Sequence, residues 1–186
     1  MTPYQTGRLE NAICYFAKEH KERSGRPLYQ TFLYKYLAFL DFMTLEEIGK
    51  PSFGIVYRAM ENGPVPIDLY NRRYNYETNL FVFVSLEEKK VIIVPKSEPD
   101  MDYFSEYEIE QMNALLDRFA KRGIKSKDIC NASHSIKAWA KAWRREHNSM
   151  IDYADTFDDL SQKSENELLI EEERFLVYRG IESLCK

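Results

Sequence analysis

Hydrophobic residues recur at three- and four-residue steps over most of the chain, and this spacing is typical of amphipathic helices. Apolar positions from Leu9 to Ala17 share one helical face, and Gly25 followed by Pro27 predicts the end of this first helix. A second helical pattern covers about 29–47 and is apolar over more than half of its circumference. We therefore expect this second helix to lie at the centre of the fold, with neighbours on several sides.

The stretch after the second helix predicts a short third helix and a rigid turn. Apolar residues recur at helical spacing over about 52–60. The run GPVP at 63–66 should end a helix, since glycine accepts a positive φ angle and proline cannot continue the hydrogen-bond ladder. Ile67 to Tyr70 then suggests another short helix.

Two short segments, 79–86 and 90–95, are dense in β-branched and aromatic residues and flank the polar break at 87–89. They predict an antiparallel β-hairpin. Strands this short are not stable in isolation. We therefore expect the hairpin to pack on the helices, or to be extended by a third strand or by a partner.

The second half of the chain is again helical in pattern. A capping box at Ser105 begins a helix that is expected to run to Gly123. Residues 126–146 are interpreted as one short helix followed by a longer one, in which Trp139 and Trp143 share a face. The predicted fold is therefore α+β and mainly α, a helical domain with a small antiparallel β-hairpin.

Lys35 and Asp41 stand out because they flank or interrupt the apolar surface of the second helix. Two interpretations stay open. Lys35 faces solvent and Asp41 is a carboxylate at the helix end, or both belong to a buried or groove-lining polar network, because a charge in an apolar wall must be paired or hydrogen-bonded. His20, at the end of the first helical stripe, is interpreted as a surface or cap histidine.

Cys130 and His134 raise the question of a nucleophile with its base, or of half a metal site. The chain has three histidines and three cysteines, without a second closely spaced pair, and this argues against both. We interpret His134 as a buried hydrogen-bonding residue. Motifs such as G-x-S-x-G, H-E-x-x-H and a phosphate loop are absent, so we expect no catalytic residue, metal or cofactor. An enzyme with an unrecognised site remains an alternative.

Composition narrows the class of protein further. A length of 186 residues with 44% hydrophobic content fits one folded domain, and a net charge of −4 argues against a dedicated nucleic-acid binder. Cys14, Cys130 and Cys185 form an odd set without close spacing, which indicates a reducing compartment. No apolar stretch is long enough to span a membrane, and the N-terminus lacks the layout of a signal peptide. We therefore expect a cytoplasmic protein that does not engage membranes.

The chain divides by composition into residues 1–148 and an acidic segment, 149–186. Ser164 and Glu167 form another capping box, which predicts a last helix that packs on the same domain. The acidic charge is interpreted as a solvated face. In the alternative, 150–164 is a flexible acidic linker and the last helix mimics or masks a basic partner surface.

Several residue types at set spacing resemble the Panacea family, also called the phage-associated GepA-like or SocA-like antitoxin domain. The matching residues are Lys35, Leu37, Phe39 and Asp41, the G-x-x-Y of Gly54 to Tyr57, Gly63 to Pro66, and Ser133, His134 and Trp139. They occur in the family's order and span roughly 8–146 with the intervening strands. Lys50 to Ser52 fit the family's pattern loosely, and the acidic segment lies outside the resemblance.

The resemblance implies an antitoxin that binds and neutralises a protein toxin encoded nearby, and SocA-like members also act as adaptors to a AAA+ protease. The residues implied for the partner-binding surface are Lys35, Asp41, Tyr57, Gly63, Pro64, Val65, Pro66 and His134. A structural or interaction protein of a phage or mobile element is the alternative. Neighbouring genes discriminate the two, because a small toxin-like reading frame favours the antitoxin and a run of virion genes favours the alternative.

Overall fold

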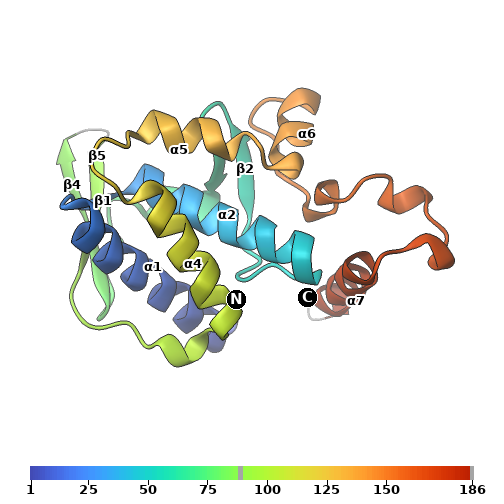
Figure 1. The fold of residues 1–186 in the computed structure, drawn as a ribbon, viewed down its shortest axis with the longest axis horizontal. Coiled ribbons are helices and arrows are strands. Elements are labelled where there is room, and N and C mark those ends of the chain that lie inside the picture. The colour runs from blue at the N-terminus through green and yellow to red at the C-terminus, as the bar shows by residue number, and fades with distance from the viewer. Residues whose placement is uncertain (88–89, 185–186) are drawn as a thin grey trace.

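The central element of the protein, in a computed structural model that describes residues 1–87 and 90–184, is the helix α2, Gln30–Ile48 (Figure 1). Thirteen of its 19 residues are buried, and Gly49 ends it with a left-handed φ of 74°. The helices α1, α4, α5 and α7 and the strand β3 all contact α2. The prediction of a central helix surrounded by neighbours is confirmed.

The first helix, α1, runs over Pro3–Ser24, begins with a capping box at Thr2 and ends at Gly25. A three-stranded antiparallel sheet of order β1–β5–β4 packs against it. Its strands are β1 (Leu28–Tyr29), β4 (Phe81–Glu87) and β5 (Lys90–Pro95). The predicted hairpin is confirmed and is extended by a third strand, as one of the alternatives expected. Residues 88 and 89 of its connection, like Cys185, lie outside the described residues.

The second half is helical, as predicted. Its helices are α4 (Glu106–Phe119), α5 (Ser126–Ser133) and α6 (Lys137–Arg145), after a short 3-10 turn at Met101–Tyr103. The capping box at Ser105 begins α4 as expected, but α4 ends at Phe119 and not at Gly123. The fold class, α+β and mainly α, is confirmed.

The helix predicted over about 52–60 is wrong. Residues 51–56 are irregular, and β2 (Tyr57–Met60) follows as a strand with alternating burial. Gly54 adopts a positive φ of 63°, which a right-handed helix does not allow. The backbone N–H groups of Phe53 and Gly54 donate to the carboxylate of Asp41 rather than to a helical ladder.

The interpretation of 63–66 as a turn that stops a helix is also wrong. Gly63–Pro66 forms the strand β3, which pairs with β2 in antiparallel register, Tyr57 opposite Pro66. The turn of this β2–β3 hairpin is made by Glu61 and Asn62, and both are exposed. The short helix expected next is confirmed as α3, Ile67–Arg72.

His20 is buried, so its interpretation as a surface or cap histidine is wrong. Its Nδ1 lies 2.9 Å from the hydroxyl of Tyr36, and its ring contacts Phe32. Burial lowers the pKa of His20 to about 4, because the low-dielectric interior disfavours the imidazolium. The histidine is thus a neutral member of the core between α1 and α2.

The C-terminal segment extends away from the body of the protein and returns as α7, Ile170–Leu184, against the end of α2 (Figure 1). Three 3-10 turns precede it, Tyr153–Thr156, Leu160–Gln162 and Glu165–Glu167. The capping box at Ser164 begins the third turn and not α7 itself. Phe175 of α7 is buried, with its ring centroid 5.3 Å from that of Phe157. No described helix has the length and apolar content to cross a membrane.

Candidate functional site

Most of the residues singled out in the sequence surround the β2–β3 hairpin. Lys35 and Asp41 come from two faces of α2, Tyr57 lies on β2, and 63–66 is β3 itself. These residues are buried, whereas His134, at the end of α5, is half-buried. The two charged residues are 1% and 0% exposed, so the second interpretation, a buried polar network, is the correct one.

Lys35 holds β3 through its ammonium group. Its Nζ donates to the carbonyl oxygen of Pro64 at 2.8 Å. Burial lowers the pKa of Lys35 to about 8, since desolvation disfavours the charged form, while the nearby thiol of Cys130 acts weakly in the opposite direction. The lysine is therefore a costly buried cation with a specific partner on β3.

Gly63 allows α2, α5 and β3 to meet. Its φ is 95°, and an added Cβ would lie 2.1 Å from the Oγ of Ser133 and 3.1 Å from the Nζ of Lys35. The Ser133 hydroxyl donates to the Cys130 carbonyl at 2.7 Å, which holds it in place. Only a residue without a side chain fits here without displacement.

Asp41 organises the other side of the hairpin. Its Oδ1 accepts from the N–H of Phe53 at 2.5 Å and of Gly54 at 3.3 Å. Its Oδ2 lies 3.0 Å from each of the hydroxyls of Tyr57 and Tyr153. Burial raises the pKa of Asp41 to about 6, although these four donors each favour the carboxylate. One side chain thus fixes the loop before β2, the strand itself and the segment after α6.

A column of four stacked rings lies beside the hairpin. The ring centroids of His134 and Trp139 are 4.2 Å apart, those of Trp139 and Trp143 5.9 Å, and those of Trp143 and His147 3.8 Å, with interplanar angles of 6°, 11° and 9°. The indole of Trp139 donates to the carbonyl of Met60 at 3.0 Å. The ring column therefore fixes the end of the β2–β3 hairpin. Within the described residues the Nε2 of His134 has no hydrogen-bond partner, so stacking replaces the expected hydrogen bond there.

An open hollow of about 530 Å³ lies where the hairpin turn and the ring column meet. Its lining residues are Met60, Glu61, Asn62, Val65, Trp143, His147 and Asn148. The carboxylate of Glu61 and the ring of His147 are exposed there. The hollow combines aromatic surface, a carboxylate and amide groups, a combination that suits a cationic or aromatic side chain.

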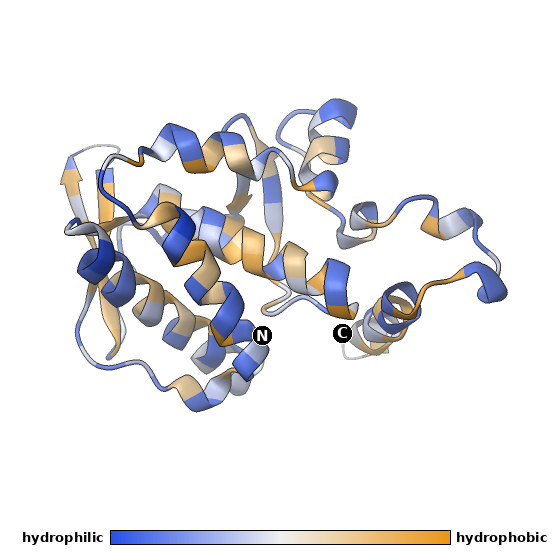
Figure 2. Cartoon of the chain, in the orientation of Figure 1, coloured by the Kyte–Doolittle hydropathy of each residue, from blue (hydrophilic) through white to orange (hydrophobic). Residues whose placement is uncertain are grey.

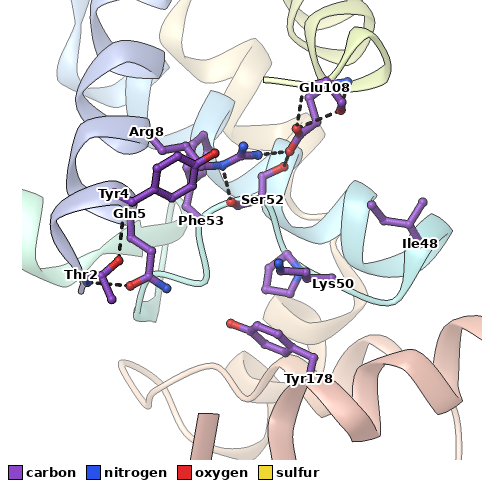
Figure 3. Close-up of a pocket in the computed structure, with 12 residues that line it drawn as sticks. Thr2, Tyr4, Gln5, Arg8, Ile48, Lys50, Ser52, Phe53, Glu108 and Tyr178 are labelled. Atoms are coloured by element: carbon purple, nitrogen blue, oxygen red, sulfur yellow. Dashed lines mark hydrogen bonds and ion pairs between the residues drawn. The ribbon is translucent and has the colours of Figure 1, made fainter. Parts of the chain in front are cut away.

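A second cavity of about 500 Å³ lies between the start of α1, the end of α2 and α7 (Figure 3). At its base Arg8 forms an ion pair with Glu108 and donates to the Ser52 carbonyl at 3.0 Å, while the Ser52 hydroxyl donates to Glu108 at 2.7 Å. Tyr178 faces this base from α7 (Figure 3). The ionised groups already satisfy one another, so the arrangement serves to hold the elements together.

Some residues of these networks were not found from the sequence. Tyr153 lies 112 positions after Asp41, outside every motif, and no local signal points to it. His147 lies in a turn beyond the end of α6 at Arg145, so helical spacing does not place it in the ring column either. Within the described residues, no group of three or more metal-ligating side chains gathers.

The fold and the hydrogen bonds of Lys35 and Asp41 define a mainly helical domain in which a buried helix, α2, holds the β2–β3 hairpin through two charged side chains. A family model described as "Antitoxin SocA-like, Panacea domain" matches residues 33–140, and because this is more than half of the chain, the protein belongs to that family. No curated protein and no solved structure matches the chain. Membership indicates an antitoxin-like role with a protein as partner, and it points away from an enzyme.

Lys35 should make stability depend on pH in the alkaline range. The pKa of Lys35 is about 8 in the folded protein and 10.5 in the unfolded chain. Between these pH values the unfolded chain holds more protons than the folded protein, so the free energy of unfolding rises with pH. Relative to Lys35→Met, the wild type should gain on the order of 3 kcal/mol over this range. Urea unfolding of both proteins from pH 7.5 to 10 checks it. Cys130 is coupled to Lys35, so Cys130→Ala is introduced into both proteins; the other cysteine and tyrosine side chains are common to both, and parallel curves would contradict the prediction.

Proposed function

We propose that this protein is an antitoxin that neutralises a toxin protein, encoded nearby, by binding it directly. The family match over residues 33–140 carries the proposal, because this span contains all of the candidate residues. The buried members, Lys35, Asp41, Tyr57 and Gly63 to Pro66, act by holding the hairpin, and the toxin contacts what the hairpin presents. His134 belongs to the ring column at the edge of that surface.

The hollow beside the hairpin turn is the contact surface in this proposal. Aromatic rings that are already stacked lose little conformational entropy on binding, and protein interfaces are enriched in such residues. Exposed Glu61 adds a carboxylate that can pair with a basic side chain of the toxin. The acidic net charge of −4 favours encounter with a basic partner in the same way.

A growth-rescue experiment tests the proposal. Each adjacent small reading frame is expressed alone and together with this protein, and rescued pairs are tested for co-purification. Glu61→Lys combined with His147→Ala should abolish rescue and weaken binding by at least about tenfold, because both side chains lie in the hollow. Both residues are exposed, but His147 stacks on Trp143, so the unfolding midpoint of the variant is measured as well, and the loss of rescue counts only if the variant is folded at the temperature of the experiment.

Glu110→Lys is the matched control, because it makes the same charge change at an exposed position on α4 away from the hollow. It should rescue as well as the wild type. Should no neighbour be toxic or bound, the antitoxin proposal fails. The toxin's half-life separates the two modes of neutralisation: a stable toxin in the complex supports a direct block, whereas loss that depends on a AAA+ protease supports the adaptor mode.

A further inference from the structure

The helix α7 has two apolar faces, and the domain covers one of them. On the covered face, Phe175 is 2% exposed, and Tyr178 lines the cavity that Figure 3 shows. The docked face is tightly fitted, since a Cβ on Gly49 would lie 2.3 Å from the carbonyl oxygen of Glu171. This contact accounts for the attachment of α7 but not for its remaining apolar residues.

The opposite face carries an apolar stripe that nothing in the described chain covers. Its residues are Ile170, Val177, Ile181 and Leu184, which are 62%, 63%, 57% and 87% exposed. Spacings of seven, four and three residues place them on one side of a helix, and Val177, two residues after Phe175, points about 200° away from the docked face. The segment entering α7 is coloured as hydrophobic in Figure 2. Glu173 lies on the same side between Ile170 and Val177, and the exposed apolar residues are concentrated from Val177 to Leu184. Exposed apolar residues gathered on one helix face in this way are typical of an interaction surface.

Charge around the stripe is uneven. Glu165, Glu167 and Glu173 lie within five positions of its first residue, Ile170, and are exposed, and no ion pair is found for them within the described residues, whereas Glu172 is paired with Lys163. Arg174 is the one base in this group of positions. Acidic side chains near a helix N-terminus also stabilise the helix, because they interact favourably with its dipole. Their combined negative potential nevertheless lies at one end of an exposed apolar stripe, and this sets which partner fits.

We propose that the stripe binds an amphipathic helix of the protein partner, with apolar residues on one face and lysine or arginine at the end that lies over Ile170. The inference rests on the antitoxin function and names the kind of partner segment. A second copy of this chain fits less well, because the acidic end of each α7 would need lysine or arginine side chains from the other copy. At the Leu184 end the nearest described base, Arg179, is engaged by Asp152 at 3.4 Å. Because α7 lies outside the matched span 33–140, this contact is specific to chains that carry such a helix.

Two labelled synthetic peptides test the stripe on the full chain by fluorescence anisotropy. Both have leucine on one helical face, and one has lysines at one end where the other has glutamates. The lysine peptide should bind at least about tenfold more tightly than the glutamate peptide. Val177→Gln with Ile181→Gln should weaken its binding by about tenfold or more. Leu176→Gln, on the same helix but off the stripe, is the control and should leave binding unchanged.

Equal binding of the lysine peptide to the stripe variant and the wild type overturns the inference. So does a wild-type dimer in sedimentation velocity that the stripe variant loses, because the occupant is then a second copy. The growth-rescue experiment separates this result from the antitoxin function. If the stripe variant still rescues growth and co-purifies with the toxin, the inference fails and the proposed function stands; if the wild type rescues no neighbour, the proposed function fails by itself.

Discussion

Replacing Gly63 with alanine is expected to lower the free energy of unfolding by about 3–5 kcal/mol. The new methyl group would meet Ser133 Oγ at 2.1 Å on a backbone whose φ is 95°. The overlap is with Ser133 at the end of α5, so β3 must shift away from α5, and this also disturbs the contact between Lys35 and Pro64. Denaturant unfolding followed by circular dichroism measures the loss.

Gly123→Ala is the matched control for this substitution. Gly123 has nearly the same φ, 93°, but nothing lies within 4 Å of an added Cβ. It should cost about 1–2 kcal/mol from strain alone. The double change Gly63→Ala with Ser133→Ala should recover part of the loss, because it removes the overlapping oxygen. Equal losses for the two glycine variants would mean that the close packing around β3 contributes nothing.

Replacing Asp41 with alanine should be the other severe change, at about 3–5 kcal/mol. It leaves two backbone N–H groups and the hydroxyl of Tyr57 without their buried acceptor, and it removes one of the two acceptors near the hydroxyl of Tyr153, which keeps the Ile55 carbonyl at 2.7 Å. The loop before β2 and the segment around Tyr153 should both loosen, which hydrogen exchange at Phe53 and Gly54 would report. Native-like protection of these amides in the variant would contradict the assigned role.

Asp41→Asn is the matched control, since it keeps the size of the side chain and one acceptor oxygen. The pKa of Asp41 is about 6 in the fold against 3.8 unfolded, so between these values the folded protein holds more protons. The stability of the wild type relative to Asp41→Asn should therefore fall as pH rises from about 4 to 6, by on the order of 3 kcal/mol. His20 titrates with the opposite sign in this window but is common to both proteins.

The elements that the sequence predicts well are those with local signals. A glycine ends α1 and α2, a capping box begins α4, and β-branched residues mark β4 and β5. The β2–β3 hairpin could not be found this way. The helical spacing of Phe53, Val56, Tyr57 and Met60 is coincidental, because the distant carboxylate of Asp41 takes the N–H groups that a helix would need.

The candidate site shows the same limit. The sequence singles out Lys35 and Asp41 as charges in an apolar wall, but a pattern cannot say whether such a charge is buried until the partners are known. Those partners are the Pro64 carbonyl and Tyr153, 29 and 112 positions away along the chain. In α7, periodicity likewise shows two apolar faces without telling which one the domain covers. Phe175 is buried, whereas Leu176 and Ile181 of the same helix are exposed.

The burial of most of α2 has a consequence for the chain while it is being synthesised. Residues 30–48 leave the ribosome early, but their cover includes Ser133, Tyr153 and Phe175, which follow much later. At 5–20 residues per second, the last of these is made roughly 6–25 s after α2. During this interval the most apolar helix of the protein is without its final neighbours, and the nascent chain presents it to chaperones and to other unfolded chains.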